Sequence, residues 1–285
     1  MNPLNAPLYD LFLHLNTLNG LLLNINDQLN SFEKSYRQSI SETSFGISSI
    51  YSGSSIAIRD LTEWPENSVA KYYSCGAPFS VKGEEYFELI KILIAREASW
   101  TISQAYEAFE TFLKNTLILL LLENPELAEI KKIEKFKLDK KRGDLKESDF
   151  SFWEEYLKYY YKTNSLKLKF LRKICPAIYK SETENNRTID LNNWFAVVEE
   201  VRHSATHSNF IVKNNRMGHW TRAKNEMLKN HFHGRELWYG YILNTTIEDA
   251  KFSLILFSEY SFQIYKFLLI SRGYDWNILQ KKSEQ

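Results

Sequence analysis

The stretch WTISQAYEAFETFLKNTLILLLLEN (residues 100–124) decides the fold, because its large apolar side chains recur every three or four positions. This spacing is typical of a helix with one buried face. The same period reaches back to Gly83, and Pro125 cannot continue the helix. The sequence therefore predicts one long helix, or two joined end to end, from Gly83 to Asn124.

Working outward, the same periodicity predicts further helices on both sides. They are expected over Leu8–Tyr36, Phe150–Ile174, Leu191–His207 and Ile247–Ser271. Asp190 and Thr246 stand where the last two helices need N-caps, whereas Pro176 follows the end of Phe150–Ile174 and Gly273 follows the end of Ile247–Ser271. Ile130–Asp149 is charge-dense and predicts a linker with a frayed helical turn. Residues 208–245 predict an irregular connection.

The segment from Ser41 to Ser80 has a different composition, rich in Ser and Gly. Its short alternating stretches, such as Ser48–Ile58, predict either an ordered loop or a small hairpin. Pro78 marks the expected boundary. We therefore predict an all-α protein in which residues 1–80 form an accessory helix plus this irregular segment, and residues 83–275 form a helical domain.

Composition excludes several classes of protein. Hydrophobic residues make up 44% of the chain, which is too many for a disordered protein, and ten Gly and six Pro favour long helices. Two cysteines without a CxxC pair favour reduced thiols. The first basic residue is Lys34, and the longest apolar run, Leu117–Leu122, is too short to cross a bilayer. We expect a cytoplasmic protein with no membrane partner.

Histidine is concentrated in one region, since five of the six lie between residues 203 and 233. His203 and His207 are one helical turn apart, which suits a divalent metal, but a third ligand would have to come from His219, His231 or His233. A second interpretation is a metal-free acid–base pair of Arg202 and His207. A third is a solvated helix end without chemistry. We favour the second and expect neither a metal nor a cofactor.

Two short segments resemble one known family. VRHSATH (201–207), an Arg-x4-His at the end of an amphipathic helix, looks like the motif of the HEPN superfamily, in which a polar residue usually follows the Arg. AYEAFETFLKN (105–115) resembles the helix that opens many members. At the level of helix order the resemblance covers about residues 83–275, whereas residues 1–80 resemble nothing we can name.

The resemblance implies a fold, an assembly and a set of catalytic residues. It implies an up-and-down four-helix bundle that dimerises, with the two motifs facing an RNA cleft. Arg202 and His207 would be the catalytic pair, and His203 and Glu110 would orient them, with Glu107 as second choice. The implied activity is metal-independent RNA cleavage through attack of the 2′-OH, in a toxin or an antiviral-defence effector with an antitoxin or defence partner. The alternative is an inactive, dimeric interaction module that binds a protein partner.

Helix geometry limits how the pair can act. Five positions at about 100° each place His207 about 140° around the helix from Arg202. One regular helix in one subunit therefore cannot direct both groups at the same phosphate. Either the helix breaks near Thr206, or each cleft takes its groups from two subunits.

The net charge of +1 conceals basic regions. Between Lys131 and Lys173 there are 14 basic and seven acidic residues, and Leu157–Lys173 carries six basic residues, no acidic ones and several aromatic rings. Cations and rings together are typical of single-stranded RNA binding, although a solvated helix face explains them equally well. A second basic stretch directly follows the motif. The candidate RNA-binding residues are Lys213, Arg216, Arg222, Lys224, Lys167, Lys169 and Arg172.

Overall fold

The computed structural model describes residues 2–42, 50–51, 56–59, 72–75, 80–81, 83–138 and 145–276. The chain divides into two compact units, one made of Met1–Leu23 with Ala95–Gln285 and the other of Asn24–Ile94. This division differs from the expected 1–80 and 83–275, because the start of the first helix packs with the larger unit: Leu8, Leu11, Leu15 and Leu22 are all buried there. The predicted boundary at Pro78 lies outside the described residues.

The long helices begin and end close to where their sequence signals stand. They are α1 (Asn5–Glu42), α2 (Gly83–Glu123), α7 (Leu191–His207) and α10 (Ile247–Ser271). Asp190 caps α7 by accepting from the amide of Asn193 at 2.9 Å, and Thr246 and Asp249 form a reciprocal capping box at the start of α10. A predominantly helical protein is thus confirmed, whereas the specific four-helix bundle stays a prediction.

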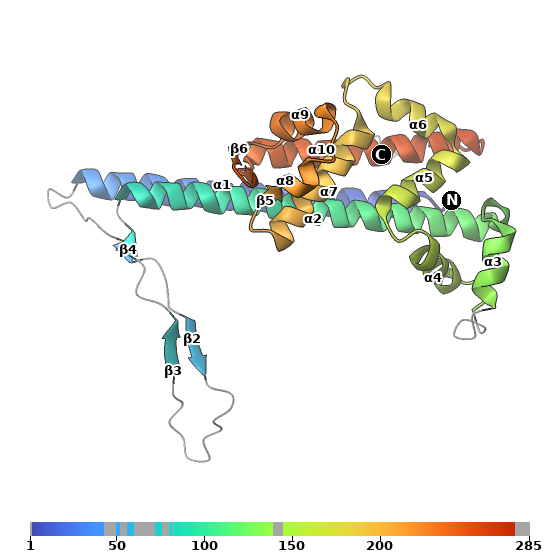
Figure 1. The fold of residues 1–285 in the computed structure, drawn as a ribbon, viewed down its shortest axis with the longest axis horizontal. Helices are drawn as coiled ribbons and strands as arrows, with labels where there is room; N and C mark the ends of the chain where they lie inside the picture. The colour runs from blue at the N-terminus through green and yellow to red at the C-terminus, as the bar shows by residue number, and fades with distance from the viewer. Residues whose placement is uncertain are drawn as a thin grey trace, which may run out of the picture. The chain divides into compact units, whose positions relative to one another are not determined.

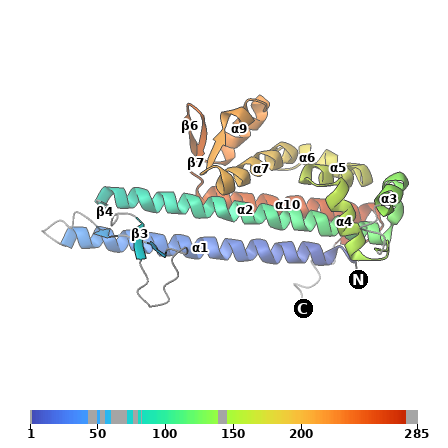
Figure 2. The same ribbon diagram turned by 60° about the horizontal axis from the view of Figure 1, so that its bottom comes forward.

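Aromatic packing joins the helices of the larger unit, in which α10 runs alongside α2 and α7 lies across them (Figures 1 and 2). Phe109 of α2 is at the centre, with its ring centroid 5.2 Å from Phe195 of α7 and 5.4 and 5.3 Å from Phe257 and Tyr260 of α10. The start of α1 is tied to α10 by the Tyr265 hydroxyl, which donates to Asn5 at 2.6 Å. These contacts fix α7, the helix that carries the motif.

The smaller unit contains the end of α1, the start of α2 and two antiparallel strand pairs. Strands β1 (Ile50–Tyr51) and β4 (Ser80–Val81) form one pair, and β2 (Ile56–Arg59) and β3 (Tyr72–Cys75) form the other. The expectation of strands near Ser48–Ile58 is therefore met, but β2 pairs with residues about fifteen positions later rather than within that stretch. The guanidinium of Arg37 lies 3.8 Å from the ring centroid of Phe87.

Between α2 and α7 the predicted elements need correction. Pro125–Leu127 forms a 3-10 turn, and the expected linker contains a formed helix, α3 (Ile130–Lys137), whose Ile133 and Phe136 are buried. The expected single helix Phe150–Ile174 is two helices, α4 (Phe150–Tyr160) and α5 (Asn164–Ile174), because Thr163 caps a new start at Asn164 by accepting from the amide of Leu166. Pro176 does not only close a helix: it occupies the first turn of α6 (Pro176–Thr183), where its missing N–H costs nothing.

The expected irregular connection between α7 and α10 is an ordered subdomain. It consists of a three-stranded antiparallel sheet, in the order β5 (Ile211–Lys213), β7 (Gly240–Leu243), β6 (Gly234–Leu237), with α8 (Asn214–Met217) and α9 (Arg222–His231) inserted. Gly240 is required there, since a Cβ would lie 2.5 Å from the carbonyl oxygen of Val212. Among the helices described, none combines the length and the apolar character needed to cross a membrane.

Candidate functional site

The C-terminal end of α7 presents the motif. Trp194, Val198, Val201 and Ala205 are buried against the core, while Arg202 and His203 flank this stripe and His207 is exposed. The helix continues without interruption through His207. The first of the two geometric alternatives, a break near Thr206, is therefore excluded, and within one chain Arg202 and His207 point in different directions.

The backbone reverses immediately after the motif. Asn209 and Phe210 have φ angles of 48° and 64°, and the Phe210 amide donates to the carbonyl of Ser204 at 2.9 Å. A left-handed conformation is uncommon for a bulky side chain such as phenylalanine and costs free energy. This strained turn sends the chain directly from His207 into β5, so the end of α7 is held by the sheet.

Arg202 connects α7 to α2. Its Nη2 donates to Glu107 at 3.1 Å, in an ion pair whose side chains are 32% and 47% exposed. Its Nε is buried and has no hydrogen-bond partner among the described residues. A buried guanidinium N–H without an acceptor is costly in a folded protein. Arg202 therefore has one guanidinium N–H, on Nε, that no acceptor among the described residues satisfies.

The two motif histidines lie side by side. The ring centroids of His203 and His207 are 5.1 Å apart, with an angle of 50° between the planes. Partial burial and the cation of Arg216 lower the pKa of His203, against the opposing effect of Glu200. Arg216 is itself paired with Glu200 at 2.8 Å. His203 is therefore held in its neutral form near neutral pH, where an imidazole can accept a proton.

The acidic partner differs from the one expected first. Glu110 contacts Lys167 at 2.7 Å instead of Arg202, and the ammonium of Lys167 also donates to Asn164 at 3.0 Å. Glu107, the second choice in the sequence, is the residue that meets Arg202. Glu107 also borders a surface hollow of about 370 Å³ between α1 and α2, together with Asp10, His14 and Asn115.

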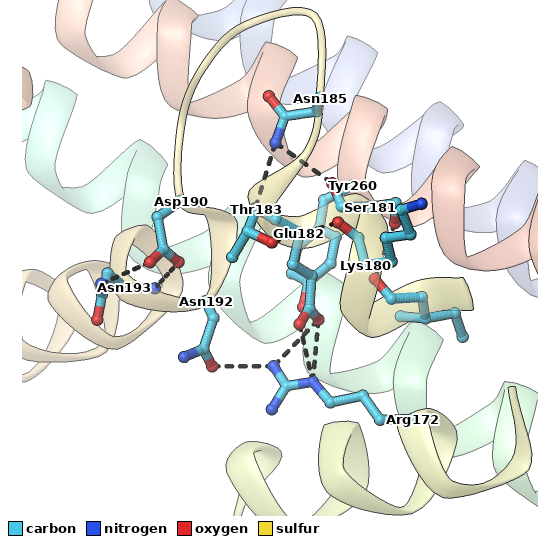
Figure 3. Close-up of polar contacts among 11 residues, drawn as sticks. Arg172, Lys180, Ser181, Glu182, Thr183, Asn185, Asp190, Asn192, Asn193 and Tyr260 are labelled. Carbon is cyan, nitrogen blue, oxygen red and sulfur yellow. Dashed lines mark hydrogen bonds and ion pairs between the residues drawn. The ribbon is translucent and has the colours of Figure 1, made fainter. Parts of the chain in front are cut away.

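Two of the candidate RNA-binding cations are held in ion pairs within the fold, Lys167 buried and Arg172 partly buried. Lys167 is only 7% exposed and is held by Glu110. Arg172 donates from Nε and Nη2 to Glu182 at 3.1 and 3.0 Å, and from Nη2 to Asn192 (Figure 3). The fully buried Glu182 also accepts from the hydroxyl of Tyr260. This network links α5, α6, α7 and α10, so both cations serve the fold.

The other candidates are on the surface. Arg216 and Arg222 are paired with Glu200 and Glu226, which compensates part of their charge. Lys213 is exposed, and neither it nor Lys169 or Lys224 forms an ion pair within the described part of the chain. Trp238 is 90% exposed at the tip of the β6–β7 hairpin. Trp238 stands between two short strands and just before Gly240, a position that predicts the tip of a hairpin.

The alternative metal site has no support in the described ranges. No group of three or more His, Cys, Asp or Glu side chains is arranged there to hold a metal ion. His231 instead stacks on Phe252, with centroids 5.3 Å apart, and Nδ1 of His233 bonds to Asp249 at 2.8 Å.

Comparison with known proteins adds no family assignment. No family model, no curated protein and no solved structure matches this chain. What the chain does must therefore be argued from the site alone.

Proposed function

We propose that this protein is a metal-independent endoribonuclease of the HEPN type, acting as a homodimer. The observation that carries the proposal is Arg202, which joins α7 to α2, has a buried Nε without a partner among the described residues, and directly precedes His203, whose ring lies beside that of His207. A guanidinium with a free donor suits the negative charge that develops on a phosphorane. His207, exposed at the end of the helix, suits proton transfer with RNA.

The reaction needs no metal and no external nucleophile. The 2′-oxygen of RNA attacks the adjacent phosphorus and gives its proton to His207 of one subunit. The bond from phosphorus to the 5′-oxygen breaks, and that oxygen takes the proton back from His207, which leaves a 2′,3′-cyclic phosphate, a 5′-hydroxyl and a neutral imidazole. Arg202 stabilises the charge on the non-bridging oxygens, His203 positions the neighbouring ring, and Glu107 positions Arg202.

The dimer is part of the proposal because α7 is regular. Since one helix directs Arg202 and His207 to different sides, a complete site requires Arg202 of one subunit and His207 of the other. Lys213, Lys224, Arg216 and Arg222 follow the motif and would contact the phosphates of the RNA. In this function we place the protein in the cytoplasm, as a toxin or defence effector controlled by a partner protein.

Incubation of the dimer with total RNA in EDTA tests the activity. We expect cleavage with cyclic phosphate ends, and its loss in Arg202→Ala and His207→Ala. His219→Ala is the matched control, because His219 is exposed and outside the motif. The proposal is overturned by absence of cleavage in the wild type, or by cleavage that neither motif substitution diminishes.

A second function is favoured by the same ion pair. Because the guanidinium of Arg202 is already tied to Glu107, the motif could serve only to join α7 to α2 in a non-enzymatic dimer that binds a protein partner. That function predicts that Arg202→Ala and His207→Ala leave both RNA and cell growth unaffected while one protein copurifies in a fixed ratio. Growth arrest on overexpression that requires His207 decides for the enzyme.

A further inference from the structure

A basic and aromatic groove lies in the larger unit, on residues that the proposed catalytic mechanism does not use. It has a volume of about 630 Å³ and is bordered by residues from the start of α3 to α6. Its polar and aromatic lining includes Lys132, Tyr160, Tyr161, Lys169, Lys173 and Tyr179. We infer that this α3–α6 groove binds single-stranded RNA, with lysines on the phosphates and tyrosine rings against unpaired bases.

The cations of the groove come from separate helices that the fold brings together. Lys132 belongs to α3, whereas Lys169 and Lys173 are one turn apart on α5. Glu129 lies between two of them, at 3.0 Å from Lys132 and 3.7 Å from Lys173, and offsets part of their charge. Lys169 is exposed, and Lys173 is 66% exposed, so both ammonium groups can reach a phosphate.

The rings of the groove are positioned by packing and by cations. Tyr161 stacks on Phe170, with centroids 4.8 Å apart and planes within 12°. The ammonium of Lys132 lies 5.5 Å from the ring of Tyr161 and 5.8 Å from that of Tyr160. Tyr179 is 60% exposed, and the guanidinium of Arg172 lies 5.9 Å from its centroid. A ring with one face open is available for stacking on a base.

The internal network anchors one residue of the groove wall, Arg172. Arg172 lines the groove but is anchored to the buried Glu182, which also accepts from Tyr260 in the core. Its role is therefore to position Tyr179 rather than to neutralise a phosphate. Preorganised rings lose little entropy when a base binds, which favours a ligand with flat faces.

The chemistry of the groove selects a single strand over other polyanions. A duplex offers phosphates but keeps its bases stacked inside, so it could use the lysines and leave the tyrosines unused. A single strand can use both, through counterion release and base stacking. This inference deepens the proposed function by naming a second contact for its RNA, yet it is tested by binding and not by cleavage.

The experiment measures fluorescence anisotropy of a labelled oligouridine of about 12 nucleotides, a length that one such site can hold. All proteins carry Arg202→Ala and His207→Ala, so that the probe is not cut. We expect Lys169→Gln/Lys173→Gln to reduce the slope of log K against log salt by about 1.4, the value for two phosphate contacts on a single strand. Lys158→Gln/Lys180→Gln removes two exposed lysines outside the groove lining and is expected to change the slope little.

The rings are tested separately. Tyr179→Leu is expected to weaken binding about tenfold, whereas Tyr179→Phe keeps the ring and the affinity. All the substituted side chains of α4, α5 and α6 in these variants are exposed, so unchanged thermal melting checks that the fold is intact. A thymidine DNA strand that binds equally also supports the groove, because stacking and phosphate contacts do not use the 2′-OH.

The inference is overturned if the groove and control lysine variants bind alike, if an RNA duplex of the same length binds as tightly as the single strand, or if no binding occurs. Cleavage that survives loss of the groove leaves the proposed catalytic function standing. Binding without cleavage in the wild type removes the catalytic function and leaves the groove.

Discussion

Glu182 shows how one buried carboxylate joins three helices, α5, α6 and α10. It is fully buried, and it accepts from Arg172 and from Tyr260. Burial raises the pKa of Glu182, whereas the hydrogen bonds from Tyr260 and Arg172 act in the opposite direction. Removing one partner of a buried pair leaves the other charge without compensation, so this residue matters more for stability than an ion pair on the surface.

We predict that Glu182→Ala lowers the free energy of unfolding by about 3–5 kcal/mol, measured by urea denaturation. Glu184→Ala is the matched control: Glu184 is two residues away, is 67% exposed and pairs with Lys180, so its removal should cost less than about 0.5 kcal/mol. Equal losses in the two variants would show that the buried network does not stabilise the fold.

Glu107 and Glu110 show where prediction from the sequence stops at this scale. Both are on α2, three positions apart, and the sequence favours Glu110 as the partner of the motif. In the structure Arg202 meets Glu107, whereas Glu110 meets Lys167 from α5. Which cation each carboxylate meets depends on how α5 and α7 are placed against α2, and side-chain spacing on α2 alone does not contain that information.

At the scale of the element, two glycines have opposite roles. Gly20 lies in the interior of α1, where an added Cβ has no atom within 4 Å. We predict that Gly20→Ala raises the free energy of unfolding by about 0.5–1 kcal/mol, since alanine reduces the freedom of the unfolded chain and favours the helix. A thermal melt measures the change, and a lower melting temperature would contradict it.

Gly240 is different because it begins β7 against β5. A Cβ there would lie 2.5 Å from the Val212 carbonyl and 2.9 Å from the side chain of Ile211. We predict that Gly240→Ala disrupts the β5–β7 pairing and speeds exchange of the amides of Ile211–Lys213, measured by hydrogen exchange. Unchanged protection of these amides would mean that the sheet adapts to the side chain.

The contact of α9 with α10 predicts a pH dependence. His231 at the end of α9 stacks on Phe252, and burial lowers its pKa, with Asp249 opposing. The unfolded chain therefore binds the proton more readily, near its ordinary value of about 6.5. Stability contributed by neutral His231 is complete above that pH and is lost as the pH falls below it. His231→Phe keeps the ring without the titration.

We expect the melting temperature of the wild type to fall between about pH 7.5 and about pH 5.5, and to fall less in His231→Phe. If the melting temperature falls equally with pH in both proteins, the acid sensitivity belongs to other groups, such as His203, whose pKa is lowered as well.

The elements found from the sequence are those with a long apolar period and a cap, such as α7 with Asp190 and α10 with Thr246. The sequence does mark the split between α4 and α5, because residues 162–165 (KTNS) carry no apolar side chain and the Thr163 hydroxyl caps the new start, but the apolar spacing on either side favours a single helix. The β5–β7–β6 sheet was missed because its strands have three or four residues, too few for a period to be recognised. Its order depends on pairing between β5 and a strand 27 positions further on.

For the whole molecule, counting charges gives an incomplete account of the surface. The basic excess between Lys131 and Lys173 suggests a large cationic face. In the structure Lys167 and Arg172 are paired with Glu110 and Glu182, which compensates their charge, so the excess that RNA could reach is smaller. Three of the remaining cations, Lys132, Lys169 and Lys173, line the α3–α6 groove, which fits local binding of RNA there.

The assembly predicts a complementation experiment that belongs to the whole molecule. If each site takes Arg202 from one subunit and His207 from the other, a dimer of one Arg202→Ala chain and one His207→Ala chain contains one intact and one doubly defective site. Two inactive homodimers, when mixed and allowed to exchange subunits, should therefore regain about one quarter of wild-type cleavage, since half of the dimers are mixed and each has one site. The measurement is the initial rate of RNA cleavage before and after exchange.

As a control, Arg202→Ala mixed with the Arg202→Ala/His207→Ala double variant should regain nothing. If the subunits are shown to have exchanged and no cleavage returns, the shared site is wrong. Arg202 and His207 would then have to act from the same chain, which the regular α7 helix does not allow.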